Sequence, residues 1–191
     1  MKPFTESLRH EYKLTPESVA VDLGAFHGGW AKTIHEKYRC PVLAFEPVKS
    51  FFAIASENCA MFPKIALYNC GLGDHFYQPE FGIQNDSTGI FAGSEVREKV
   101  IIVEAVSYLR QIHPKGFFDL IKINIEGGEA DLLDHVLSQN AATMFGNIQV
   151  QWHRCIPDCQ KRYDAVAAGL SKTHHLTWCE PWCWESWEMN A

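Results

Sequence analysis

Two acidic side chains stand where strand-like segments give way to turns. The first, Asp22, lies near the end of a short apolar run that leads into a glycine-containing turn, in the segment Val21-Asp22-Leu23-Gly24-Ala25-Phe26-His27-Gly28. Glycine lets the backbone bend sharply and approach a ligand without a Cβ in the way. The second acid, Glu46, closes the run 42–45, about 20 residues past the first glycine, where nucleoside-binding α/β folds place a carboxylate that accepts both ribose hydroxyls. These residues predict a nucleoside pocket; the alternative is a tight turn beside a solvated acid.

Phe26 indicates which nucleoside would fit. In the dinucleotide fingerprint, the second glycine lets the pyrophosphate touch the backbone, and Phe26 occupies that position when the template starts at Gly24. Its bulky ring disfavours a pyrophosphate. S-adenosylmethionine carries no phosphate, and Asp22 could meet its cationic amino-acid end. His27 lies inside the same turn and is expected to touch the cofactor by its location.

A second segment could carry acid–base chemistry: Lys122-Ile123-Asn124-Ile125-Glu126-Gly127-Gly128-Glu129. Glu126 follows a strand at its carboxyl end, where open α/β sheets bind their ligands. A hydroxyl acceptor must lose a proton, so Glu126 is a candidate base. Glu129 falls in the first turn of the next helix, where the helix dipole alone would also favour a carboxylate.

His153 and Lys122 complete the candidate catalytic set. His153 follows the strand-like run 148–152, and a neutral imidazole there would suit proton removal. The alternative is a histidine that closes the strand and bonds to backbone. Lys122 sits in mid-strand, where an unpaired ammonium is costly to bury. It is therefore expected to reach a carboxylate, either Asp22 or Glu126, and to organise the site.

Short β-branched runs alternate with helical patterns, which predicts βαβ units. The expected strands are 19–23, 42–45, 65–69, 100–106, 120–125 and 148–152, and the expected helices are 30–38, 48–59 and 129–137. The predicted fold class is α/β, a Rossmann-like, doubly wound, mostly parallel sheet with helices on both faces. Residues 1–14 are predicted as an N-terminal arm or short helix, and residues 15–191 as a single domain. Residues 82–93 read as an excursion that covers the site.

Composition limits the classes of partner. The chain has 191 residues, of which 47% are apolar and 21% charged, so it can bury a full core. Its net charge of −6 and lack of a basic run argue against a nucleic-acid partner. The apolar runs are too short to span a bilayer, and the first residues lack a secretion signal. We therefore expect a cytoplasmic protein with no membrane partner.

The seven cysteines do not suggest a disulfide framework, because their number is odd and no signal peptide is apparent. Four of them form two pairs, Cys155 with Cys159 and Cys179 with Cys183, and four thiolates could bind zinc. The spacing within each pair is less diagnostic than a two-residue gap. Idle or buried thiols are the interpretation that we favour, and no metal site is predicted.

Taken together, these motifs resemble the FkbM-type family of S-adenosylmethionine-dependent methyltransferases. Three of the family's motifs match Val21-Asp22, Gly24-Ala25 and Gly28, then Phe45-Glu46-Pro47, then Gly71-Leu72 and Asp74. Its most distinctive segment aligns with Asp119, Lys122-Ile123-Asn124, Glu126-Gly127 and Glu129. The resemblance implies the class I methyltransferase architecture. Asn124 departs from the family's aspartate, which leaves a metal or base role at this position open, and Phe26 departs from a common Asn.

The resemblance implies an S-adenosylmethionine-dependent methyltransferase. The expected acceptor is a small molecule, and the expected reaction is O-methylation of a hydroxyl on a sugar or similar compound; nitrogen stays open as the target atom. The expected cofactor-binding residues are Asp22, Gly24, Ala25, Phe26, His27, Gly28, Glu46, Pro47, Asp74 and Asn124, and the expected catalytic residues are Glu126, His153 and Lys122. The alternatives are a nicotinamide-dependent oxidoreductase or a non-catalytic nucleoside- or partner-binding domain. The sequence is compatible with a homodimer.

Overall fold

The computed structural model describes residues 3–84, 88–90 and 92–191. Within them, seven strands form one sheet in the order β10-β11-β9-β8-β1-β2-β3. β11 runs antiparallel between β9 and β10, whereas the pairs from β9 to β3 are parallel. The strands are β1 (Ala20–Leu23), β2 (Val42–Phe45), β3 (Ile65–Tyr68), β8 (Leu120–Ile123), β9 (Asn147–Gln151), β10 (His174–Glu180) and β11 (Trp184–Met189). The predicted doubly wound, mostly parallel sheet is confirmed.

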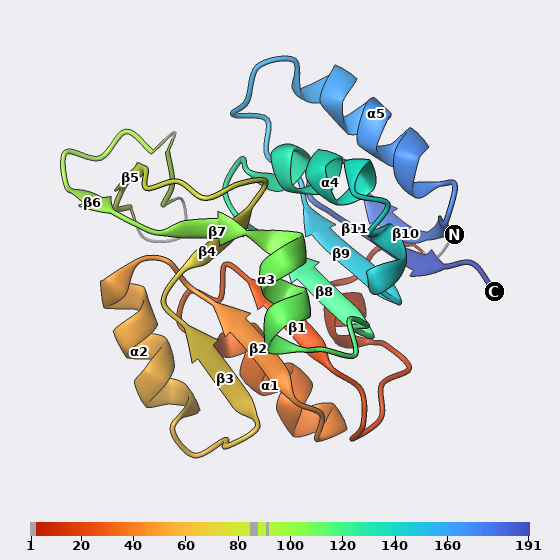
Figure 1. The fold of residues 1–191 in the computed structure, drawn as a ribbon, viewed down its shortest axis with the longest axis horizontal. Helices are drawn as coiled ribbons and strands as arrows, with labels where there is room; N and C mark the ends of the chain where they lie inside the picture. The colour runs from red at the N-terminus through yellow and green to blue at the C-terminus, as the bar shows by residue number, and fades with distance from the viewer. Residues whose placement is uncertain (1–2, 85–87, 91) are drawn as a thin grey trace.

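Helices cover both faces of this sheet (Figure 1). The helices are α1 (Gly29–Tyr38), α2 (Lys49–Cys59), α3 (Ala105–Ile112), α4 (Glu129–Ser138) and α5 (Cys159–Leu170). One apolar core joins α3, α4 and α5 to strand residues such as Val21 and Ile123. A second core joins α1 and α2 to Ala20 and Val42. Successive strand residues point to opposite faces, so β1 contributes to both cores.

The predicted strand 100–106 is wrong in its extent and its place. Only Ile102–Glu104 forms a strand, β7, which pairs with β4 (Gly71–Gly73) outside the main sheet. The helix α3 then begins at Ala105 because the Glu104 carboxylate accepts the backbone N–H groups of Val106 and Ser107 at 2.8 Å each. β5 (Glu80–Gly82) and β6 (Arg97–Lys99) form a separate hairpin-like pair.

The N-terminal arm packs on the sheet face rather than on an edge. After the 3-10 helix Glu6–His10, the Tyr12 hydroxyl donates to Oε1 of Gln149 on β9 at 2.9 Å. The guanidinium of Arg9 stacks over the Trp184 ring at 4.1 Å. The arm thus covers β9 and β11.

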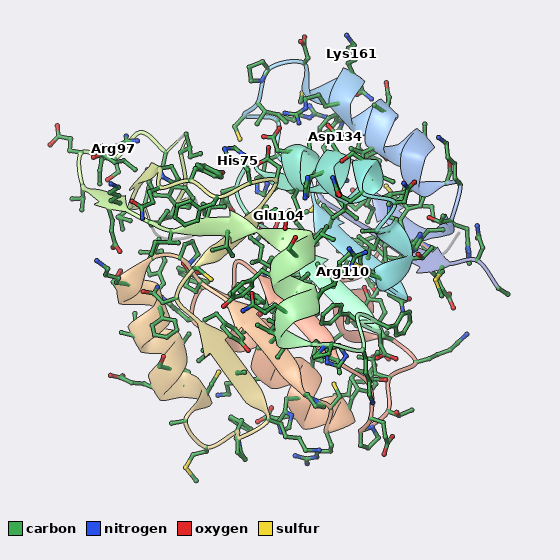
Figure 2. All side chains as sticks on the ribbon, viewed as in Figure 1. His75, Arg97, Glu104, Arg110, Asp134 and Lys161 are labelled. Carbon is green, nitrogen blue, oxygen red and sulfur yellow. The ribbon has the colours of Figure 1, made fainter. Side chains whose placement is uncertain are left out.

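Charged side chains such as Arg97, Arg110 and Lys161 lie on the outside of the molecule (Figure 2). In the described part of the chain, none of the helices combines the length and the apolar character needed to cross a membrane.

The C-terminal segment is rich in tryptophan and packs into the core, where Trp178, Trp184 and Trp187 are all buried. The Glu185 side chain, 1% exposed, accepts from the indole N–H groups of Trp152 and Trp187 at 2.8 Å each and from the Tyr163 hydroxyl at 2.9 Å. Both indoles share Oε1 of this carboxylate, so the network joins β11, α5 and the residue that follows β9.

Glu185→Gln is expected to lower the free energy of unfolding by only about 1 kcal/mol, because the amide oxygen still accepts both indoles. Burial raises the pKa of Glu185, so the folded chain holds its proton more tightly than the unfolded chain. That contribution to stability is present at low pH and is lost as pH rises through the folded-state pKa. The difference in the free energy of unfolding between the wild type and Glu185→Gln should therefore shrink as pH rises. Urea unfolding at several pH values measures this, and a deficit that grows with pH would contradict it.

Candidate active site

A cavity of about 210 Å³ opens at the carboxyl ends of β1, β2 and β8. This is where the chain order of the sheet reverses, and it is where open α/β sheets bind their ligands. Seven residues predicted for the site line the cavity: Gly24, Phe26, Glu46, Pro47, Asp74, Asn124 and Glu126. The sheet thus brings together residues more than a hundred positions apart in the chain.

The turn after β1 depends on Gly24. Its φ of +74° is in the left-handed region, and a Cβ there would lie 1.9 Å from the carbonyl oxygen of Asn124. The turn is closed by the N–H groups of Gly24 and Ala25, which both donate to the Phe45 carbonyl, at 3.1 and 3.0 Å. Any side chain at position 24 would push the turn off β8.

Glu46 ties the end of β2 to this turn. Its carboxylate, 5% exposed, accepts the N–H of Phe26 at 2.8 Å through Oε2 and the N–H of Val48 at 2.9 Å through Oε1. Burial raises the pKa of Glu46 to about 7, although the two backbone donors act in the opposite direction. Glu46 is therefore a buried acid of the cavity wall and not a solvated one.

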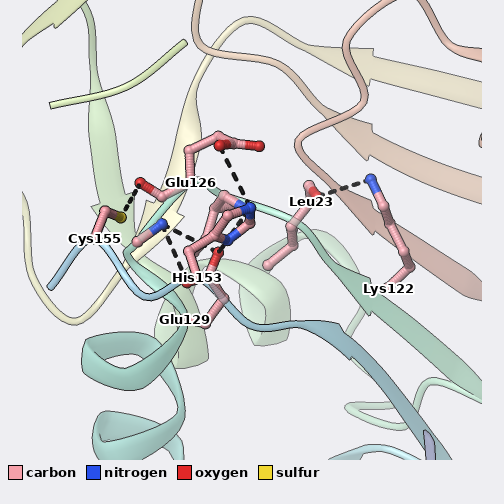
Figure 3. Close-up of polar contacts among 8 residues, drawn as sticks. Leu23, Lys122, Glu126, Glu129, His153 and Cys155 are labelled. Atoms are coloured by element: carbon pink, nitrogen blue, oxygen red, sulfur yellow. Dashed lines mark hydrogen bonds and ion pairs between the residues drawn. The ribbon is translucent and has the colours of Figure 1, made fainter. Parts of the chain in front are cut away.

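Asp22 and Lys122 form a buried ion pair beneath the turn. The strand register places them opposite each other, and Nζ lies 2.9 Å from Oδ1 of Asp22. Nζ also donates to the carbonyls of Leu23 at 3.2 Å and Gly24 at 2.8 Å; the first of these contacts is drawn in Figure 3. The expectation that Lys122 reaches Asp22 is confirmed. Burial raises the pKa of Asp22, and the Lys122 ammonium opposes that effect.

The loop after β8 presents Glu126 to the cavity. Glu126 and Gly127 both have positive φ, at 54° and 105°. The carboxylate of Glu129, 1% exposed, holds this shape by accepting the N–H of Ile125 at 3.1 Å and that of Gly127 at 3.2 and 3.1 Å. Glu129 is therefore a structural acceptor that bends the loop back from the strand.

His153 lies between these two carboxylates (Figure 3). Nδ1 is 2.9 Å from Oε1 of Glu129, and Nε2 is 3.4 Å from Oε2 of Glu126. Burial lowers the pKa of His153, but its bonds to Glu126 and Glu129 outweigh burial and raise this pKa to about 10. The raised pKa and the two carboxylate contacts favour a charged imidazole, which argues against the predicted neutral general base.

The comparisons place these features in a family. A sequence model of the Methyltransferase FkbM domain matches residues 22–167. The chain belongs to this family. Its matched domain is of the S-adenosylmethionine-dependent methyltransferase type, which supersedes the nicotinamide oxidoreductase alternative. None of the curated protein sequences matches the chain significantly.

Solved methyltransferases share the fold of this FkbM methyltransferase at low identity. The METTL16 methyltransferase domain is 11% identical, with a TM-score of 0.57; the match covers 97% of this chain and 65% of that one. A putative rRNA methylase from Clostridium thermocellum is 10% identical, with a TM-score of 0.58 and coverage of 93% and 89%. The Podospora anserina methyltransferase PaMTH1, solved with S-adenosylhomocysteine, is 14% identical, with a TM-score of 0.51 and coverage of 91% and 72%.

The cavity of this FkbM methyltransferase fits the cofactor. Within the described part of the chain, the buried Oδ1 of Asn124 has no hydrogen-bond partner, so a bound ligand can supply one. Each oxygen of Glu46 accepts one backbone N–H and keeps a further lone pair for a ribose hydroxyl. Asp74, which follows β4, also lines the cavity.

Six predicted site residues are not among the described residues that line the cavity: Asp22, Ala25, His27, Gly28, Lys122 and His153. The Asp22 carboxylate turns to Lys122 under the turn, so its predicted contact with the cationic end of the cofactor is not supported. His27 stacks on the Phe26 ring, with the centroids 3.7 Å apart.

Sequence reasoning missed several lining residues, namely Phe51, Tyr77, Phe81 and Asp131. The sequence indicated only weakly that Asp131 could line a site, because this residue lies off the apolar stripe of α4. Nothing in the sequence indicated this for the three aromatic residues. The predicted covering excursion 82–93 places Thr88 and Ile90 at the cavity, while residues 85–87 and 91 lie outside the described residues.

The two cysteine pairs do not assemble a metal site. Across the described ranges, three or more His, Cys, Asp or Glu side chains are nowhere placed to hold an ion. The Cys155 thiol lies 4.0 Å from the Glu126 carbonyl, whereas the Cys179 thiol lies 3.9 Å from Glu185. Cys40, Cys59 and Cys70 are buried and free, as expected for small hydrophobic residues.

Proposed function

We propose that this enzyme methylates a hydroxyl group on a sugar or other neutral small molecule, and that Glu126 accepts the hydroxyl proton. The observation that carries the proposal is the placement of the Glu126 carboxylate at the cavity, on a loop fixed by Glu129 at the carboxyl end of β8. When bound, S-adenosylmethionine supplies an electrophilic methyl group on a sulfonium sulfur. A base is then needed within hydrogen-bond reach of the attacking hydroxyl.

Different residues of the cavity would bind different parts of the cofactor. Glu46 would accept hydrogen bonds from the ribose hydroxyls, and Asp74 would accept one from a donor on the adenine. The Asn124 amide would bind a polar group near the reacting end. Lys122 keeps the Leu23 and Gly24 carbonyls in place, which fixes the turn under the cofactor. Holding methyl and acceptor in line is a large part of the catalysis expected for a direct displacement.

The charge of the lining favours a neutral small acceptor over a nucleic acid. Among the described residues that line the cavity, Glu46, Asp74, Glu126 and Asp131 are acidic, and none is Lys or Arg. A phosphate-bearing acceptor would meet like charges and no basic partner. We accordingly propose a small-molecule partner and no nucleic-acid partner.

Cofactor binding tests the proposed contact between Glu46 and the ribose. Glu46→Gln should weaken S-adenosylhomocysteine binding by a factor of about 10–100, because charge-assisted hydrogen bonds to the ribose are lost. The ribose donates to the ionised carboxylate, whose pKa is about 7 in the free protein, so wild-type affinity should fall as pH drops below that value. Calorimetry across about pH 6–8 measures both effects.

The exposed residue Glu57 on α2 supplies the matched control, since Glu57→Gln leaves the cavity lining untouched. Equal affinities for wild type and Glu46→Gln would contradict the ribose assignment. Methyl transfer from labelled S-adenosylmethionine to a panel of neutral sugars tests the proposed hydroxyl acceptor. Methylation of amino groups, with hydroxyl-only sugars left unmodified, would overturn the choice of oxygen.

A further inference from the structure

Both ring nitrogens of His153 face carboxylates. Nδ1 meets Glu129 at 2.9 Å and Nε2 meets Glu126 at 3.4 Å. An ionised carboxylate only accepts hydrogen bonds, and a neutral imidazole has a single N–H. Two carboxylate contacts on opposite nitrogens therefore call for the imidazolium form.

The Glu129 carboxylate links His153 to the loop that carries Glu126. The same Oε1 atom accepts from His153 and from the Ile125 N–H, and both oxygens accept from Gly127. Glu126 lies between those two backbone donors. One buried acid thus sets both the bend of the loop and the orientation of the imidazole that faces Glu126.

We propose that His153 and Glu129 are positioning residues, and that His153 acts as a fixed cation that holds the Glu126 carboxylate at the cavity wall. The ionisable groups around the imidazole come from three segments: Glu126 after β8, Glu129 on α4 and Cys155 after β9. Cys155 stays neutral near pH 7, because burial raises the pKa of its thiol. The two glutamates are then the charges that keep His153 protonated.

The first experiment requires no acceptor. NMR of the full chain with labelled histidine should show the His153 ring protonated through neutral pH, with a pKa near the value of about 10 set by its carboxylates. Glu129→Gln and, separately, Glu126→Gln should each lower that pKa by about 1–3, because each removes one adjacent negative charge. Two variants are used because Glu129→Gln also weakens the loop.

His135 is the internal control, since its imidazole contacts Glu104 and not the cavity. The NMR signals of its ring should be the same in the wild type and in the Glu126→Gln variant. A His153 ring that titrates near its ordinary value in the wild type, or that ignores both substitutions, would overturn the proposal.

The second experiment rests on the proposed function and uses a double-mutant cycle. A residue that acts through Glu126 loses its effect when Glu126 is gone, so the double variant His153→Gln/Glu126→Gln should be no slower than Glu126→Gln alone. If the losses in rate of the two single variants multiply in the double variant, His153 acts on the substrate directly and the positioning role is overturned. If no hydroxyl acceptor is methylated while the NMR coupling is present, the proposed function fails and the His153 assignment stands.

Discussion

Glu126→Gln is expected to lower the rate of methyl transfer by a factor of about 10²–10⁴, the range that general-base groups contribute. The amide keeps the size of the side chain and can still accept a hydrogen bond, but it cannot take the hydroxyl proton. Glu126 is absent from the bonds that close the turn after β1, so the affinity for S-adenosylhomocysteine should stay close to that of the wild type. Single-turnover rates at saturating cofactor measure the loss.

The matched control for this variant is Glu36→Gln, an exposed carboxylate on α1 remote from the cavity lining. A rate for Glu126→Gln equal to that of the control would exclude Glu126 as the base. A parallel collapse of cofactor affinity would indicate instead that Glu126 shapes the cofactor pocket, which would also contradict the assignment.

The part of the cavity wall that we propose holds the cofactor could be located from the sequence because its signals are local. The strand, the glycine turn and Glu46 follow one another within a single βαβ unit, and parallel pairing of β1 with β2 brings the two strand ends together. Even there, the direction of Asp22 could not be predicted. The sequence left both Asp22 and Glu126 open as partners of Lys122, and the register of β1 on β8 shows that Asp22 is the partner.

For Glu126 and His153, to which we propose roles in catalysis and positioning, the sequence predicted the location but not the protonation state. His153 follows β9 and Glu126 follows β8, and those strands pair in parallel, so their proximity was foreseeable. The charge of His153 depends on both Glu126 and Glu129 lying against its ring, which is a property of the folded loop. The mistaken strand 100–106 has a similar cause. Its β-branched residues favour a strand, but the Glu104 cap starts a helix at Ala105.

Lys122→Met is expected to lower the free energy of unfolding by about 3–5 kcal/mol, the cost of leaving a buried charge without its partner. Asp22 is fully buried, and Lys122 is 3% exposed, so water cannot replace the lost ammonium. The variant also removes the Nζ donor from the carbonyls of Gly24 and Leu23, although Leu23 still accepts the Asn124 N–H, and this loss should weaken cofactor binding through the turn. Urea unfolding at neutral pH measures the stability, and calorimetry measures the affinity.

The pH dependence of the same variant identifies the cause. Without Lys122, the pKa of Asp22, already raised by burial, has lost its main opposing influence. The folded variant then binds a proton more tightly than the unfolded chain, so its stability must rise as pH falls and decline as pH climbs through the folded-state pKa. The double variant Asp22→Asn/Lys122→Met removes both charges of this pair, so it should recover much of the lost stability and show little of this pH dependence. If the double variant is as unstable as Lys122→Met at every pH, the carbonyl contacts, and not the charge of Asp22, account for the role of Lys122.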